Sequence, residues 1–165
     1  MVTRYVAPSV VVAILLVYAC PQRGVANPPP EGPKRLSICE LVEHQDLHDG
    51  ESVRVRARLQ TDAIEHTFAA DTDPAKECAV LIRSSSTVDS NTPAKEHLDH
   101  LSSALTKAHH TSTESHNKIV QAELFGVFHR DESKTYMPSL ELTDAIGVKI
   151  VEGAGLVPPI PPKPK

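Results

Sequence analysis

The stretch that decides the fold is Glu51–Leu59, which reads ESVRVRARL. Its apolar residues and its arginines alternate, with Val53, Val55, Ala57 and Leu59 in one set and Arg54, Arg56 and Arg58 in the other. Successive side chains of a β-strand point to opposite faces, so this period of two predicts a strand with one buried face. We therefore expect a sheet with an apolar inner side and an arginine stripe on its outer side.

Two further segments downstream predict strands. Ala63–Ala70 (AIEHTFAA) alternates, with Ile64, His66 and Phe68 on one face. Cys78–Arg83 (CAVLIR) is short, apolar and rich in β-formers, which predicts a buried strand. Between them, an Asp- and Pro-containing cluster predicts a turn.

The last third of the domain predicts two more strands. Ile119–Phe128 (IVQAELFGVF) reads as one strand, with Gly126 as a candidate β-bulge. Leu140–Leu142 and Val148–Val151 are also strand-like, and we expect a break over Asp144–Gly147 between them.

Two segments predict helices. Ser37–Leu47 opens the domain with apolar residues at helical spacing, and Ser37 with Glu40 three residues later forms a capping-box pattern. Pro93–Ala108 has Pro at the first helical position and Thr92 as a candidate cap. Its apolar stripe consists of Leu98, Leu101, Leu105 and Ala108.

The expected fold class is therefore mainly β with one or two helices, in the order β-β-β-α-β-β behind a leading helix. This is the order of an OB-fold, a five-stranded Greek-key barrel with its helix between strands three and four. The segment 37–58, SICELVEHQDLHDGESVRVRAR, resembles exported bacterial OB-fold-like proteins in which a short helix and an Asp-Gly turn precede a V-R-V-R-G strand. Ala57 replaces the usual Gly. The resemblance implies the fold and an exported location, but no activity, because members of that group are mostly uncharacterised.

The N-terminus, residues 1–19, predicts a signal peptide. Arg4 is followed by the apolar run Val10–Val17, which is shorter than the roughly 20 residues that a membrane span needs. Cys20 follows Val17-Tyr18-Ala19, and this resembles a lipoprotein lipobox. We expect lipid attachment at Cys20 and anchoring to a membrane, with ordinary cleavage after Ala19 or Ala26 and secretion as the alternative.

Composition divides the rest of the chain into three parts. Residues 20–35 form a Pro-rich linker, 36–153 a single domain, and 154–165 a second Pro-rich segment that we expect to be a disordered tail. The net charge of the chain is −4, yet residues 36–153 carry 11 Lys and Arg against 20 Asp and Glu. An acidic domain of this kind repels phosphate, so nucleic acid is not an expected partner.

Cysteine and histidine raise two site hypotheses. If Cys20 carries lipid, Cys39 and Cys78 remain as an even pair, which predicts a disulfide in an exported chain, with two buried free thiols as the alternative. The chain has nine His. Two pairs, His44 with His48 and His97 with His100, have the helical spacing of two-ligand metal sites, but no further ligand completes a signature, so we expect surface histidines and no metal.

The candidate ligand surface consists of Arg54, Arg56, Arg58 and His66. We expect the arginines to pair across strands with Glu65 or Glu123. His66 shares a face with Ile64 and Phe68, so it is either a hydrogen-bonded core residue or part of a small polar site with Glu65.

No catalytic motif and no cofactor motif is present, so we expect a binding or structural module of the cell envelope whose partner is a protein, a glycan or a small ligand. A metal-binding periplasmic protein, a small hydrolase and an oligonucleotide-binding OB domain stay open as alternatives.

Overall fold

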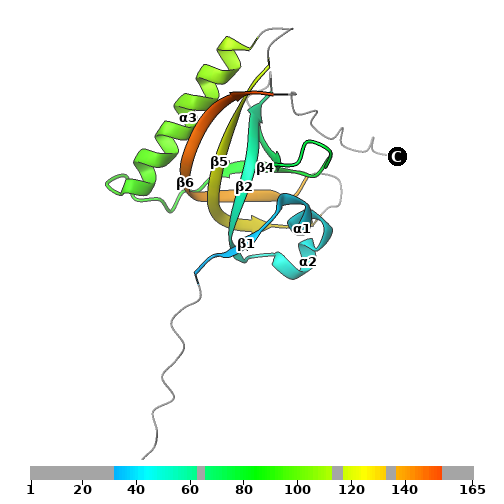
Figure 1. Ribbon diagram of the computed structural model, residues 1–165. Helices are drawn as coiled ribbons and strands as arrows, with labels where there is room; N and C mark the ends of the chain where they lie inside the picture. Colours follow the sequence, from blue (N-terminus) through cyan, green and yellow to red (C-terminus); the bar gives the residue numbers. More distant parts are fainter. Residues whose placement is uncertain (1–31, 63–65, 113–116, 133–136, 154–165) are drawn as a thin grey trace, which may run out of the picture. The chain divides into compact units, whose positions relative to one another are not determined.

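The computed structural model describes residues 32–62, 66–112, 117–132 and 137–153. Over these ranges six strands form one sheet, accompanied by three helices (Figure 1). In chain order the elements are β1 (Lys34–Leu36), α1 (Ile38–Glu43), α2 (Gln45–His48), β2 (Ser52–Thr61), β3 (Thr67–Asp71), β4 (Ala79–Ser84), α3 (Pro93–Thr111), β5 (Lys118–His129) and β6 (Ser139–Glu152). The predicted mainly β class is confirmed, as is the order of three strands, a helix and two strands. The predicted signal peptide, Cys20 and the C-terminal tail lie outside the described residues.

Strand β2 is the centre of the sheet. All four residues predicted to face the core, Val53, Val55, Ala57 and Leu59, have no exposed surface. β2 pairs with the short β1 in parallel and with β3 and β5 in antiparallel orientation. The alternating sequence therefore forms the strand with the most partners in the described part of the chain.

The strand order is β1-β2-β3-β4-β6-β5, with the additional pairing of β5 with β2. β4 and β6 run parallel, through the register from Leu81 with Ser139 to Ser84 with Leu142. β5 and β6 form a long antiparallel pair. The sheet has one strand more than the sequence pattern indicated. The additional strand is β1, whose three residues KRL are too few to show a pattern.

The leading helix is two short helices. The predicted capping box is present at the start of α1: the Ser37 hydroxyl accepts from the Glu40 amide at 3.2 Å, and the Ser37 amide donates to Glu40 Oε2 at 2.7 Å. These bonds satisfy amide groups that a helix start leaves without partners. They also lower the pKa of the Glu40 carboxyl. Ile38 and Leu41 then enter the core with no exposed surface.

The predicted break in the last strand is wrong. β6 continues through Asp144–Gly147, because its neighbour β5 supplies pairing partners for Asp144, Ala145 and Ile146. Ala145 is 1% exposed, so this segment also contributes to the core. Gly147 has φ +64°, a left-handed conformation that glycine adopts readily because it has no Cβ atom to clash with the backbone.

The β5–β6 register shifts between Phe125 and Gly126, where the sequence predicted a bulge, but the extra residue lies in the partner strand: Phe125 pairs with Asp144 and Gly126 with Leu142, so Thr143 of β6 has no register partner. A Cβ atom at Gly126 would lie 2.3 Å from the carbonyl oxygen of Glu141. The two backbones come this close only because residue 126 has no side chain.

Strand β4 is less buried than predicted. Of its residues only Val80 is fully buried, whereas Leu81 and Ile82 are half-buried and Arg83 and Ser84 are exposed. Helix α3 packs against β6, β5 and β2 and buries Leu101, Ala104 and Ala108. Because α3 packs on β6, β5 and β2, one side of β4 stays partly exposed.

Candidate functional site

The first candidate surface is the outer face of β1, β2 and β5, which we call the arginine face and define as Arg35, Arg54, Arg56, Glu123 and Phe125. Arg54 is the register partner of Arg35 in β1 and of Phe125 in β5, and Arg56 is the partner of Glu123. One Arg54 amino group donates to Glu123 Oε2 at 2.9 Å, and its Nε lies 2.9 Å from Oε1. The predicted cross-strand pairing with Glu123 is thereby confirmed for Arg54, whereas Glu65 lies outside the described residues.

Charge and burial make the outside of the arginine face cationic. The Glu123 side chain is 12% exposed, whereas that of Arg54 is 39% and that of Arg35 is 63% exposed. The hydrogen bond from Arg54 lowers the pKa of Glu123, and the same bond raises the pKa of Arg54. The Arg54 guanidinium also lies 5.4 Å from the centre of the Phe125 ring, within cation–π range. Solvent therefore meets guanidinium groups, with the carboxylate beneath them.

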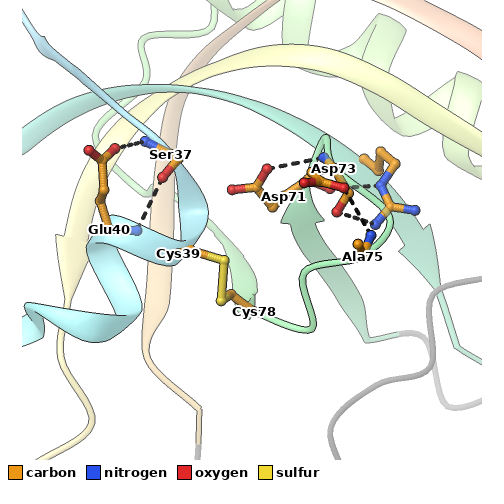
Figure 2. The surroundings of a disulfide bond; sticks show 8 residues. Ser37, Cys39, Glu40, Asp71, Asp73, Ala75 and Cys78 are labelled. Atoms are coloured by element: carbon orange, nitrogen blue, oxygen red, sulfur yellow. Dashed lines mark hydrogen bonds between the residues drawn. A yellow bond between two sulfur atoms is a disulfide. The ribbon is translucent and has the colours of Figure 1, made fainter.

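Arg58 does not belong to this surface, although it has the same place in the alternation. It is 7% exposed. Its Nε donates to the carbonyl oxygen of Asp71 at 2.7 Å, and an amino group lies 3.5 Å from that of Asp73. The loop after β3 covers Arg58, and the side chains of Asp71 and Asp73 organise that loop by accepting backbone amides (Figure 2). The expectation that Arg58 is an exposed ligand residue is therefore wrong, and its contacts are those of a structural residue.

A disulfide joins Cys39 in α1 to Cys78, the residue before β4 (Figure 2). The predicted pair is confirmed, and the bridge is compatible with an exported protein. It ties the leading helix to the chain that leaves the Asp71–Asp73 loop. This end of the domain is thus held by a covalent link, a capping box and the buried Arg58.

A second candidate surface is a groove between α3 and β4 with a volume of about 560 Å³. Its apolar lining consists of Leu81, Ile82, Val88, Leu98, Leu101, Leu105 and Leu142. Its polar lining consists of His66, Thr67, Arg83, Ser84, Ser85, Lys95, Asp99 and Ser102. Lys95 and Asp99 form an ion pair one turn apart on α3. The groove therefore offers an apolar floor beside a rim of both charges, which suits an amphipathic ligand.

His66 lies at this groove and outside the core. Its side chain is 54% exposed, its Nδ1 lies 3.3 Å from Asp62 Oδ2, and its amide donates to Asp62 Oδ1 at 2.8 Å. The core-histidine interpretation is wrong. β3 begins at Thr67, so His66 precedes the strand and does not take part in its alternation of buried and exposed residues. Arg54 and Arg56 lie on a different surface, so the four predicted ligand residues are not brought together.

The remaining histidines form separate contacts. His48 is 6% exposed and its Nδ1 lies 2.8 Å from Glu51 Oε2, so the expectation of a surface residue is wrong there. This contact lowers the pKa of Glu51. His97 Nδ1 lies 2.9 Å from Asp144 Oδ1, while His44 and His100 are exposed. Among the described residues, no group of three or more His, Cys, Asp or Glu side chains could hold a metal ion.

A third hollow, of about 990 Å³, lies between α2 and the end of β5. Arg130 lines it and forms ion pairs with Asp46 at 2.8 Å and Asp49 at 3.4 Å. The pairing with Asp46 raises the pKa of Arg130. Apart from Leu47 and Pro138, its lining is polar or charged. Among its described lining residues, Arg130 is the one Lys or Arg, and it is already paired, so this hollow is less suited to a ligand than the groove.

Sequence reasoning missed Arg35, Phe125 and the groove. Phe125 and Glu123 alternate with buried residues in β5, so the period of that strand contains the signal for the arginine face. Arg35 joins the face only through the parallel pairing of β1, which three residues cannot predict. The groove depends on how α3 sits beside β4, and that placement has no local signature.

Comparisons with known proteins add no identity: no family model, no curated protein and no solved structure matches this chain. Within the described ranges, none of the helices has the length and apolar character of a membrane span.

Proposed function

We propose that this chain is an exported binding module of the cell envelope, built on a five-stranded OB-like barrel and anchored by lipid at Cys20. The pairing of β5 with β2 links the two ends of the series β2-β3-β4-β6-β5, which supports closure. In chain order α3 lies between β4 and β5, the third and fourth of these five strands, which supports the OB-like order. The Cys39–Cys78 disulfide supports an oxidising location.

The groove between α3 and β4 is the observation that carries the binding role. Its volume of about 560 Å³ falls in the range of about 300–1,000 Å³ typical of small-ligand sites. Half-buried Ile82, Leu98 and Leu105 offer apolar surface that a ligand can remove from water. Arg83 and His66 supply polar groups at the rim. The ligand class is an amphipathic molecule or a peptide segment with an apolar part and an anionic or polar end.

The role needs no catalytic group. Two histidines near the groove or on α3 contact carboxylates: His66 contacts Asp62, and His97 contacts Asp144. Neither contact pairs a nucleophile with a base, the arrangement that acyl-transfer enzymes use. Binding is therefore the function that the geometry of the groove favours.

The experiment blocks the groove with a side chain that does not enter the core. Ser102 is exposed and lines the groove, so Ser102→Trp fills it. We expect the purified full chain to bind 8-anilinonaphthalene-1-sulfonate, an apolar anionic probe, and the variant to lose that fluorescence enhancement at least in large part. Ser103→Trp is the matched control, because Ser103 is exposed on the same helix and does not line the groove.

Equal binding by both tryptophan variants and the unchanged chain would overturn the groove as the ligand site. Circular dichroism and urea unfolding establish that each variant is folded before the probe is added.

A further inference from the structure

We infer that the arginine face is a docking surface for anionic phospholipid headgroups, which orients the domain on the membrane. This goes beyond ligand binding in the groove, because the two sites share no residue. Of the features below, only the tether rests on the proposed lipid at Cys20.

The first observation is an excess of positive charge that the fold itself brings together. Arg35 and Arg54 are direct register partners on neighbouring strands, and Arg56 lies on the same outer face two residues further along β2. Like charges directly opposite each other destabilise a sheet. On the arginine face as defined, the three guanidinium groups are balanced by one carboxylate, that of Glu123. An anion outside the protein would relieve the remaining repulsion.

The second observation is the layering of these groups. Glu123 is nearly covered, whereas Arg35 and Arg56 are exposed. Arg54 is held by Glu123 on one side and lies near the ring of Phe125. The pairing fixes the guanidinium of Arg54. The amino group of Arg35 lies 3.9 Å from Glu123 Oε1, yet 63% of its side chain stays exposed, and Arg56 is exposed as well. Guanidinium groups of this kind bind phosphate oxygens in a bidentate manner.

The third observation is where the face lies along the chain. Arg35 belongs to β1, the first described strand, which starts 14 positions after Cys20. An extended Pro-rich tether of that length spans up to about 43 Å, at roughly 3.1 Å per residue. A lipid at Cys20 would thus keep the face within reach of the bilayer.

The fourth observation is the opposite charge of the rest of the domain. Residues 36–153 carry 11 Lys and Arg against 20 Asp and Glu. An anionic membrane repels most of this surface and attracts the arginine face. The charge distribution therefore favours one orientation, with β1, β2 and β5 toward the lipid.

The test uses the full chain with Cys20→Ser, purified from exporting cells, so that binding does not depend on the lipid. Flotation compares phosphatidylcholine vesicles with vesicles that also contain phosphatidylglycerol. We expect binding only to the anionic vesicles, and its loss at high salt. Arg35→Gln with Arg56→Gln should reduce the partition coefficient about 25-fold, since each arginine near an anionic surface contributes about fivefold.

The matched control removes the same charge elsewhere. Lys76→Gln with Lys107→Gln changes two exposed lysines outside the face, and we expect a much smaller loss. An equal loss in both double variants, or equal binding to neutral vesicles, would overturn the proposal. Urea unfolding checks that both are folded, and Arg35→Lys with Arg56→Lys should retain part of the binding, because the charge is kept while the bidentate contacts are lost.

Two further outcomes separate the alternatives. If single-stranded DNA binds tightly, and the arginine double variant loses DNA while keeping vesicle binding, the face is a nucleic-acid surface and the membrane proposal fails. Failure of vesicle binding leaves the groove proposal intact, because Ser102→Trp is expected to abolish probe binding and to leave flotation unchanged.

Discussion

At the scale of single residues, the arginines of β2 show how one alternating pattern produces two environments. Arg54 and Arg58 occupy equivalent places in the sequence. Arg54 stays at the surface and pairs with Glu123, whereas Arg58 is covered by the Asp71–Asp73 loop and donates to backbone carbonyls. The covering loop comes from another part of the chain, so the difference is not visible in the repeat.

The Arg54–Glu123 pair predicts a pH dependence of stability. Because the folded-state pKa of Glu123 is lowered, its ionised form stabilises the fold above the unfolded-state pKa of about 4.3. This contribution disappears as the pH falls through the lowered pKa. Glu123→Gln should therefore reduce the free energy of unfolding at neutral pH, and the gap to the unchanged chain should close in strong acid.

Urea unfolding at several pH values measures this gap, with Glu96→Gln, an exposed position on α3, as the control. A gap that is the same at neutral and acid pH would contradict the assigned ion pair.

Gly126 predicts a steric effect at a single position. A Cβ atom there meets the Glu141 carbonyl at 2.3 Å, so the β5 and β6 backbones must separate in Gly126→Ala. We expect a loss of about 1–3 kcal/mol, typical of overpacking. Gly32→Ala is the control, because no atom lies within 4 Å of a Cβ at that position. Equal urea midpoints for the two variants would show that the close approach does not exist.

At the scale of elements, α1 depends on its connections. A helix of six residues is too short to be stable alone. The capping box starts it, Ile38 and Leu41 bury its inner side, and the disulfide joins it to the chain before β4. Sequence reasoning predicted the cap and the bridge correctly, because both leave local or compositional signals.

The disulfide predicts a large stability change. Cys39 and Cys78 are 39 positions apart, and closing a loop of that size stabilises the fold by about 4 kcal/mol in the chain-entropy model. Cys39→Ser with Cys78→Ser should lower the free energy of unfolding by roughly that amount. A reducing agent should lower the stability of the unchanged chain and leave the double variant unaffected. Insensitivity of the unchanged chain to reduction would argue against the bridge.

At the scale of the whole molecule, charge is divided between parts of the chain. The domain is acidic. The segments before and after it are basic, because they carry one acidic residue, Glu31, against six basic ones: Arg4, Arg23, Lys34, Arg35, Lys163 and Lys165. One of these basic residues, Arg35, belongs to β1 and is part of the arginine face. The net charge of −4 is therefore an average over regions of opposite sign.

Lipid attachment is the prediction at this scale. Cells grown with a palmitate analogue should label the chain, and Cys20→Ser should remove the label and release the protein from the membrane fraction. Cys39→Ser with Cys78→Ser is the control and should keep the label. A label that persists in Cys20→Ser would contradict the lipoprotein interpretation and favour ordinary signal cleavage.

The sequence by itself determined the buried face of β2, the capping box at Ser37, the helix from Pro93, an irregularity at Gly126 and the Cys39–Cys78 pair. Each of these depends on residues that are close in sequence or on a count of cysteines. Periodicity and capping act within a few residues, so a single chain is enough to recognise them.

Only the tertiary structure decided the rest. β6 runs unbroken through Asp144–Gly147 because β5 supplies its pairing partners. β1 forms a strand because it pairs with β2. Arg58 is covered by the loop after β3, His48 is buried, and His66 lies outside the core. The arginine face and the groove arise where distant segments meet. Such pairings depend on contacts between residues far apart in the chain, which local patterns do not encode.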